Sequence, residues 1–497
     1  MSQQLEALPP GWGIASLGEV CDVNVRGFLP ASASGSMRVV FVPMAAVSEE
    51  FGGIDITATR PLQEVVTGYT SFVEGDVLFA KITPCMENGK LAVVPPLPSL
   101  VGFGSTEFHV LRSGESVAPQ WLAYFLSQRE FRRAARQDMS GSAGQLRVQT
   151  GWLSAARIPL APVNEQRRIV DAVEVLLSEL DAGVRELQAA QKKLTQYRQS
   201  LLKAAVVGAL TAEWRAQNPP QETGAELLAR ILRERRAHAT ARRQAWVEPE
   251  GPSQELKAAL PTGWCWASVD QLSNVIRGAS PRPAGDPRYF GGKIPWITVG
   301  SLTAHEGKYL ERTELFVTED GKARSRWIGP DTLLLTNSGA TLGVPKITRI
   351  GGCINDGSVA LLGPDEPLKS YLYWFLRTQT SILRATNQGA AQPNLNTGIV
   401  RRIEVPLPPL AEQQQIVACV QAQVEAVLVQ GAAIDRGLRL ATAQRQNILR
   451  AAFSGQLVPQ DPNDEPASAL LERIAHARSS QQAVPKRRRA RSAKEPA

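Results

Sequence analysis

Four short segments contain residue types that could do chemistry. An NPPQ segment at 218–221 can be compared with the Asn-Pro-Pro-aromatic loop of adenine-N6 methyltransferases, and a GGKI segment at 291–294 with part of a phosphate-binding loop. A PDE segment at 364–366 and a PD pair at 330–331 offer carboxylates of the kind that nucleases use. The reactions in question would be base methylation, nucleotide hydrolysis and strand cleavage.

None of these motifs is complete. Gln221 lacks the aromatic ring that would stack on a flipped base, and no strand with a glycine-rich turn precedes it. The GGKI segment lacks the hydroxyl that would hold Mg²⁺, and neither acidic segment is followed by a well-spaced Glu-x-Lys. No cluster of acid, base and nucleophile occurs in both halves of the chain. We therefore expect a non-catalytic chain without a cofactor of its own.

The composition is that of a soluble protein with several domains. Its 497 residues are 43% hydrophobic and 21% charged, and the net charge of +8 suits a polyanionic partner. Five scattered cysteines and four separated histidines argue against a disulfide framework and against a metal site. Because we find no apolar run of about 18 residues and no signal peptide, we expect a cytoplasmic protein without a membrane span.

The chain is a tandem duplication. Four segments recur in the same order, with offsets that drift only slightly, and chance similarity would not preserve that order. The pairs are LPPGW at 8–12 with LPTGW at 260–264, IPLAPVNEQ at 158–166 with VPLPPLAEQ at 405–413, AAVVGAL at 204–210 with AAFSGQL at 451–457, and LLARI at 227–231 with LLERI at 470–474.

The duplication predicts an α+β fold with two tandem globular domains, each followed by a long helix. The domains, at 1–157 and 260–404, are rich in Gly and Pro and contain short β-type runs. We expect the remaining segments to be a central long helix at 158–213, a charged helical connector at 214–259, a C-terminal long helix with a return segment at 405–475, and a basic disordered tail at 476–497. The KRRRAR run at 486–491 in that tail could lie on phosphate or simply be solvated.

Both long helices carry a heptad-like apolar seam, which favours pairing as a coiled coil. Two separate amphipathic helices, each packed on its own domain, are the alternative. The predicted seam residues are Ile169, Val173, Leu176, Leu180, Leu187, Leu194 and Leu201 in the first helix and Ile416, Val420, Val427, Ile434, Leu438 and Ile448 in the second.

This layout resembles the specificity (S) subunits of type I restriction–modification systems. The resemblance covers nearly the whole chain and rests on the Leu-Pro-x-Gly-Trp starts and on the P-L-x-P-x-x-E-Q helix openings. Three further segments carry it: AAFSGQLVP at 451–459, DTLLLTNSGATLG at 331–343 and QPNLN at 392–396. The first domain departs from the pattern, with KITPC at 81–85 and QLRVQ at 145–149.

The resemblance implies that each domain is a target-recognition domain that reads one half of a split site in double-stranded DNA. The helices would pair antiparallel with pseudo-two-fold symmetry and dock two methyltransferase (M) subunits. Those subunits would supply S-adenosylmethionine, and restriction (R) subunits would bring ATP- and Mg²⁺-dependent cleavage. An LTAE unit at 210–213 would lengthen the spacer between the half-sites if the first helix continues through it.

Polar loop residues are the candidates for DNA contact, because Arg, Lys, Asn and Gln read base edges while Lys, Arg, Ser and Thr bind phosphates. In the first domain they are Lys81, Thr83, Asn88, Lys90, Gln145, Arg147 and Gln149. In the second they are Asn337, Ser338, Thr341, Lys346, Gln392, Asn394 and Asn396.

Two other functions remain open from sequence. The chain could be a non-catalytic coiled-coil scaffold that binds proteins rather than DNA, or a DNA-modifying enzyme that acts alone. Salt-dependent binding to duplex DNA separates the scaffold from the DNA reader. Binding of S-adenosylmethionine by the isolated chain separates the lone enzyme from both.

Overall fold

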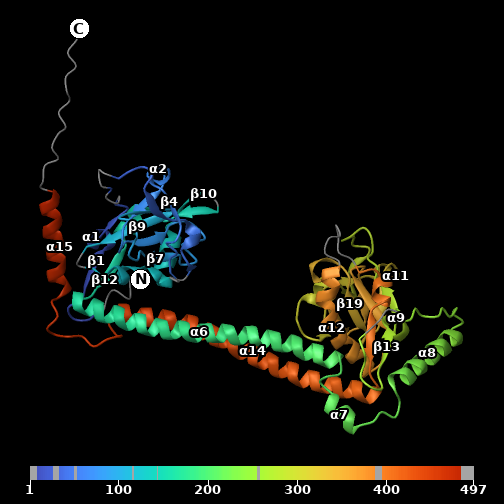
Figure 1. The fold of residues 1–497 in the computed structure, drawn as a ribbon. Coiled ribbons are helices and arrows are strands. Elements are labelled where there is room, and N and C mark those ends of the chain that lie inside the picture. Colours follow the sequence, from blue (N-terminus) through green and yellow to red (C-terminus); the bar gives the residue numbers. More distant parts are fainter. Residues whose placement is uncertain are drawn as a thin grey trace. The chain divides into compact units, whose positions relative to one another are not determined.

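The structure is a computed structural model of the 497-residue chain. It describes residues 8–25, 29, 33–49, 53–114, 117–142, 144–253, 258–386 and 395–482. The chain folds into two compact units, with boundaries between Leu187 and Gln188 and between Ile434 and Asp435. The first unit therefore combines N-terminal and C-terminal parts of the sequence, and the second unit is the segment between them (Figure 1).

The globular domain of the first unit contains two four-stranded sheets. One has the order β2 (Cys21–Val23), β9 (Phe108–Ser113), β6 (Val77–Ala80), β7 (Leu91–Val93) and is antiparallel. The other has the order β4 (Thr59–Pro61), β3 (Arg38–Val42), β8 (Gly102–Gly104), β5 (Thr70–Phe72), and its β3–β8 pair is parallel. Two antiparallel pairs complete it: β1 (Gly13–Ser16) with β12 (Arg157–Leu160), and β10 (Ser140–Ser142) with β11 (Gln145–Arg147).

Short helices join these strands and cover the core of the first domain. They are α1 (Leu17–Val20), α2 (Leu62–Val65), α3 (Pro119–Ser127), α4 (Arg129–Gln137) and α5 (Thr150–Ala155). Helix α3 contributes the fully buried Trp121 and the buried Phe125. Phe453, from the far end of the sequence, packs on both rings at centroid distances of 4.5 and 5.4 Å. The C-terminal segment thus supplies part of the first domain's core.

The second unit repeats this topology with one additional strand at the edge of its first sheet. Its first sheet has the order β14 (Asn274–Arg277), β22 (Ser358–Leu362), β19 (Leu333–Thr336), β20 (Pro345–Thr348), β16 (Tyr309–Leu310). Its second has the order β17 (Phe316–Val317), β15 (Phe290–Ile297), β21 (Gly352–Ile354), β18 (Arg326–Ile328), again with a parallel central pair. The pair β13 (Cys265–Ser268) with β23 (Glu404–Leu407) matches β1–β12. The helices are α9 (Val269–Leu272), α10 (Val299–Thr303), α11 (Glu319–Ala323), α12 (Leu368–Thr386) and α13 (Thr397–Arg401).

The repeated topology confirms the predicted fold class, an α+β chain with two tandem domains and two long helices. The predicted domain boundaries, however, lie inside strands. Residues 158–160 and 405–407 were expected to begin the long helices, but they pair with the first strand of their own domain. These segments are too short to show a strand pattern, and their partners lie more than a hundred residues away in sequence.

The two long helices are α6 (Val163–Val206) and α14 (Leu410–Phe453), each of 44 residues. Their contacts run in opposite directions along the sequence. In the first unit Arg445 forms an ion pair with Asp181, and in the second unit Tyr197 Oη donates to Gln423 Oε1 at 2.7 Å. The helices are therefore antiparallel, as predicted, and Figure 1 shows them side by side.

The predicted seam residues divide into two groups. One group is buried, mostly in the domain cores near the helix ends, and the other is half-buried. Among the half-buried residues, Leu180 packs against the core of the first domain. Leu176 is 36% exposed, whereas its neighbour Leu177 is buried, so the seam passes through Leu177. The buried residues are Ile169, Val173, Leu201, Ile416, Val420, Val427 and Ile448, and the half-buried ones are Leu180, Leu187, Leu194, Ile434 and Leu438.

Helix α6 ends earlier than the sequence suggested. It stops at Val206, and Gly208 follows with a φ of +75°, a left-handed conformation that terminates helices. The LTAE unit at 210–213 lies beyond this turn, at the start of α7 (Ala212–Gln217). Duplicating the unit would therefore lengthen the connection to α7 and not α6, so the condition for the ruler, a first helix that continues through the unit, is not met.

The connector and the return segment are equivalent helices. Helix α8 (Gly224–Ala241) packs Leu227 into the second domain, and α15 (Ala467–Gln482) packs Leu470 into the first. The tail was expected to be disordered from residue 476, but α15 continues to Gln482. The KRRRAR run at 486–491 lies outside the described residues.

Helix α14 is more apolar than the sequence analysis assumed. By length and composition alone it could cross a membrane, since one 18-residue window has a mean hydropathy of 1.5. Ala and Val provide much of this hydropathy, and 22% of the window is buried inside the protein. Ile416, Val420 and Val424 in the same helix belong to the core of the second domain.

Replacing Gly183 by alanine is expected to stabilise the first unit by about 1 kcal/mol, because glycine is a poor helix former and lies here in the middle of α6. An added Cβ would meet nothing within 4 Å. Gly437→Ala is the matched control, since its Cβ would lie 3.1 Å from Leu187 Cδ1 and should give a smaller gain. Hydrogen exchange of α6 and α14 measures both. Equal gains in stability from the two substitutions would contradict the close contact between Gly437 and Leu187.

Candidate DNA-recognition surfaces

The P-L-x-P-x-x-E-Q motif joins the last strand of each domain to its long helix. After β23, Pro409 precedes the first turn of α14, and Gln413 Nε2 donates to Pro408 O at 2.8 Å. After β12, Gln166 Nε2 donates in the same way to Ala161 O at 2.8 Å. The motif glutamine thus ties the start of each helix to the strand before it.

The motif glutamate of the second unit connects three segments: the start of α14, the α7 region and the LPTGW start. Glu412 is 2% exposed, and its carboxylate accepts hydrogen bonds from Thr211 Oγ1 at 2.7 Å, Arg215 Nη1 at 2.5 Å and Trp264 Nε1 at 2.8 Å. Trp264 belongs to the LPTGW start, and Thr211 belongs to the LTAE unit. Three motifs that the sequence analysis noted separately therefore meet at one buried carboxylate.

The equivalent Glu165 of the first unit lacks this set of partners. It is 1% exposed, and its Oε1 has no hydrogen-bond partner. Burial raises the pKa of this carboxyl, which the nearby Trp12 indole and Arg168 charge only partly offset. The residues equivalent to Thr211 and Arg215 are Val458 and Pro462, which cannot donate a hydrogen bond from a side chain.

Five of the seven candidates in the first domain lie together. Residues 81–83 run beside β11, with Val148 N donating to Lys81 O at 2.8 Å and Leu146 N to Thr83 Oγ1 at 3.2 Å. Arg147 forms a 2.8 Å ion pair with Glu107, and this hydrogen bond lowers the pKa of the Glu107 carboxyl. The exposed side chains of this group are Gln145 and Gln149.

The other two candidates of the first domain have structural contacts. Lys90 is half-buried, and its Nζ donates to the backbone oxygens of Met44 and Val47 at 3.2 and 3.0 Å. Asn88 is exposed, and its Nδ2 donates to Glu49 Oε1 at 2.8 Å. Lys90 therefore fixes a loop, and its ammonium is already occupied.

Two candidates in the second domain are buried, which corrects the expectation that they contact DNA. Asn337 is fully buried, and its Nδ2 donates to Asp356 O at 3.1 Å. Lys346 is 3% exposed, and its ammonium is bound by the backbone oxygens of His305 and Gly307. Burial, together with the nearby Arg377 charge, lowers the pKa of Lys346.

The remaining candidates of the second domain differ in position. Asn396 caps α13, since its Oδ1 accepts from Ile399 N at 2.8 Å, which is a structural role. Ser338 and Thr341 are half-buried in the turn after β19. Gln392 and Asn394 lie outside the described residues.

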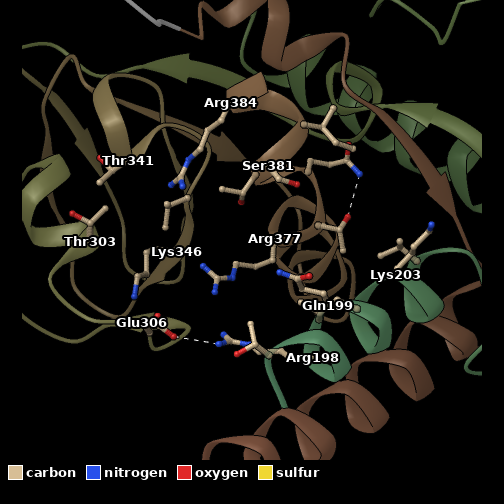
Figure 2. A pocket seen from close by; sticks show the side chains of 18 of the residues that line it. Arg198, Gln199, Lys203, Thr303, Glu306, Thr341, Lys346, Arg377, Ser381 and Arg384 are labelled. Atoms are coloured by element: carbon tan, nitrogen blue, oxygen red, sulfur yellow. Dashed lines mark hydrogen bonds and ion pairs between the residues drawn. The ribbon is translucent and has the colours of Figure 1, made fainter. Parts of the chain in front are cut away.

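Thr341 and Lys346 also line a groove that the sequence analysis missed (Figure 2). Its volume is about 1010 Å³, and it lies between the C-terminal half of α6, helix α12 and the loops of the second domain. Its lining also includes Arg198, Lys203, Arg377 and Arg384, which were not among the candidates predicted from the sequence. One signal could have found it: residues 188–206 and 368–386 contain seven Lys and Arg and no Asp or Glu.

The described residues contain no group of three or more His, Cys, Asp or Glu side chains that could hold a metal ion. What the structure offers is a pair of sheet domains with different polar loops, together with a basic groove in the second unit. Such features bind a ligand by charge and shape.

Comparisons with known proteins agree with this architecture. Residues 261–427 match the family model described as the type I restriction modification DNA specificity domain. The chain is 28% identical over 473 residues to the EcoEI specificity subunit of Escherichia coli, covering 83% of this chain and 78% of that protein. It is also 28% identical over 315 residues to the EcoAI specificity subunit of Escherichia coli, covering 54% and 52% respectively.

Solved structures share the fold. A chain from a study of complex assembly and conformational transition of the type I R-M system matches with a TM-score of 0.67 and 24% identity, over 90% of this chain and 99% of that one. The HsdS subunit from Thermoanaerobacter tengcongensis matches with a TM-score of 0.54 and 24% identity, over 92% and 100%.

A duplicated α+β domain followed each time by a long helix defines a two-domain recognition protein. Residues 261–427 match the specificity-domain family, and most of the chain is similar to type I restriction-enzyme specificity subunits, as the resemblance suggested. Specificity subunits are the non-catalytic component of type I systems, so the expected absence of catalysis is supported by this similarity.

Proposed function

We propose that this chain is the DNA-recognition subunit of a type I restriction–modification complex and that each domain reads one half of a bipartite target. The observation that carries the proposal is the same sheet topology built twice with different polar loops. Equal topology allows each domain to meet DNA in the same way, while different side chains allow different half-sites.

The loops that differ are those that carry the polar candidates. The first domain has the β10–β11 hairpin, with the exposed Gln145, packed beside residues 81–83. Residues 81–83 follow β6, and the equivalent turn of the second domain follows β19 and has Ser338 and Thr341. Base-reading residues need exposed donors and acceptors, which Gln145 provides. Gln149 is exposed too, but its Nε2 already donates to Ser140 Oγ at 2.7 Å and to Arg147 O at 3.2 Å.

Exposed apolar side chains on the long helices support docking of methyltransferase subunits. Val175 on α6 is 59% exposed, and Leu428, Val429 and Leu440 on α14 are 53%, 63% and 70% exposed. Exposed apolar side chains of this kind are available for contact with a partner subunit. Two methyltransferase subunits would contribute S-adenosylmethionine, and restriction subunits would contribute ATP- and Mg²⁺-dependent cleavage.

The purified chain alone is expected neither to methylate nor to cut DNA, because catalysis would lie in the partner subunits. Co-expression with its methyltransferase subunit should produce adenine methylation at one bipartite sequence, measured by methylome sequencing. Transfer of labelled methyl groups by the pure chain would contradict the proposal. A complex that binds duplex DNA without any sequence preference would favour the scaffold function instead.

A further inference from the structure

The groove of the second unit has two helical walls (Figure 2). Helix α6 contributes Thr195, Arg198 and Lys203, and helix α12 contributes Arg377 and Arg384. The loops of the domain close it with residues 303–306 and 341–346. All of these residues belong to the second unit, so the groove does not depend on how the two units are placed.

The lining is strongly positive. It contains Arg198, Lys203, Lys346, Arg377 and Arg384 but a single carboxylate, that of Glu306. Glu306 is 79% exposed and pairs with Arg198 at 3.2 Å, so it neutralises one charge at the rim.

Two of the cations have no partner within the described part of the chain. Lys346 is bound by backbone oxygens, and Arg384 Nε donates to Leu342 O at 2.9 Å. By contrast, the described residues offer no ion pair or hydrogen bond to the ends of Lys203 and Arg377. Two unneutralised cations in a concave site create a field that attracts an anion.

The groove also has hydroxyl groups, but most of them have structural hydrogen bonds. The hydroxyls of Thr195, Thr303 and Thr378 donate to backbone oxygens of their own helices at 3.0, 2.9 and 2.7 Å, which leaves Ser381 as the hydroxyl that suits a phosphate oxygen beside the cations. Protein contacts to the DNA backbone use this combination of Lys, Arg and Ser.

The spacing of the cations indicates a chain of phosphates. Arg198 and Lys203 are five residues apart on α6, which is about 7.5 Å along the helix, and Arg377 and Arg384 on α12 are about 10.5 Å apart. Each DNA strand carries one phosphate per roughly 3.4 Å of helix axis, so each wall can follow two or three phosphates. A single free anion would leave most of a 1010 Å³ groove empty.

We propose that the groove between α6 and α12 binds the phosphate backbone of duplex DNA and positions the second domain without reading sequence. The inference rests on the proposed function, because it names a backbone contact of the same DNA reader. The residues that carry it are Lys203 and Arg377. Base-reading loops and the backbone groove would then be separate parts of one domain.

The test is the salt dependence of DNA binding by the complex of the full chain with its methyltransferase subunit. In the double variant Lys203→Gln/Arg377→Gln, the slope of log K against log salt should fall by about 1.8, since each phosphate contact contributes about 0.9. At 0.1 M salt this corresponds to about 60-fold weaker binding, if the contacts contribute nothing near 1 M. The loss of affinity should be the same for duplexes that contain the target sequence and for unrelated duplexes.

A matched control removes two charges elsewhere in the same unit. Arg233 and Arg236 are exposed on α8, so Arg233→Gln/Arg236→Gln has the same net charge as the groove variant. It should keep the wild-type slope. Thermal unfolding and co-purification with the methyltransferase should match the wild type for both variants, which excludes a loss of fold.

Three results would overturn the inference. They are a wild-type salt slope in the groove variant, a loss confined to the target sequence, and a loss of the methyltransferase subunit with DNA affinity otherwise retained. The last would mean that the groove holds an acidic segment of that subunit. Failure of the proposed function would look different, because the wild-type complex itself would then show no preference for any sequence.

Discussion

Exchanging residues 21–149 for the matching segment of a relative should change one half of the recognised DNA sequence and leave the other half intact. The segment lies between α1 and α5, so the exchange retains the β1–β12 pair and the junction with α6. The expected effect is large, because each mismatched base pair costs about 1–3 kcal/mol. A change of two base pairs would shift the preference by at least about 30-fold.

Methylome sequencing of cells that carry the exchanged chain measures this result directly. The reciprocal control exchanges residues 274–396, between α9 and α13 of the second domain, and should change the other half. If either exchange alters both halves, the two domains do not read independently, and the proposal of one domain per half-site is wrong.

The second large effect is expected at Glu412. Replacing it with glutamine removes the charge that Arg215 contacts at 2.5 Å and one acceptor oxygen for Thr211 or Trp264. Loss of one partner of a buried ion pair typically costs about 3–5 kcal/mol, because the remaining charge is left without compensation. Hydrogen exchange should show this loss at the start of α14 and at β13.

Glu165→Gln is the matched variant with the opposite expectation. Burial raises the pKa of Glu165 above its ordinary value of 4.5, so the folded protein favours the protonated form. In the wild type, stability should therefore fall as pH rises through the raised pKa, whereas the glutamine variant is neutral throughout. At pH 7 the variant should equal or exceed the wild type in stability. Equal destabilisation by both substitutions would contradict the different roles of the two carboxylates.

The sequence predicted the architecture well, because the same motifs occur in both halves and each half gives the same domain-and-helix pattern. Motifs such as LPPGW and LPTGW, in constant order, were enough to predict two domains and two long helices. Strand β12 was missed because its partner β1 lies some 145 residues earlier, and local patterns do not report such pairing. The end of α6 depends on the backbone of Gly208, one glycine among several in the sequence that could have ended the helix.

The site was harder to predict than the fold. Asn337 and Lys346 have the side chains of DNA readers, but their burial follows from tertiary packing, and residue type does not reveal it. Lys203 and Arg377 line the groove, but the sequence analysis did not single them out. They come from helices that are distant in sequence, and folding brings them to one groove.

The position of Phe453 has a consequence for synthesis on the ribosome. Trp121 and Phe125 are made early, but the ring that covers them belongs to a segment that follows the whole second unit. Synthesis of residues 188–434 takes roughly 12–50 s at about 5–20 residues per second. During that time the first domain has an open apolar face, a surface of the kind that favours aggregation, and it completes its core only after the second domain has emerged.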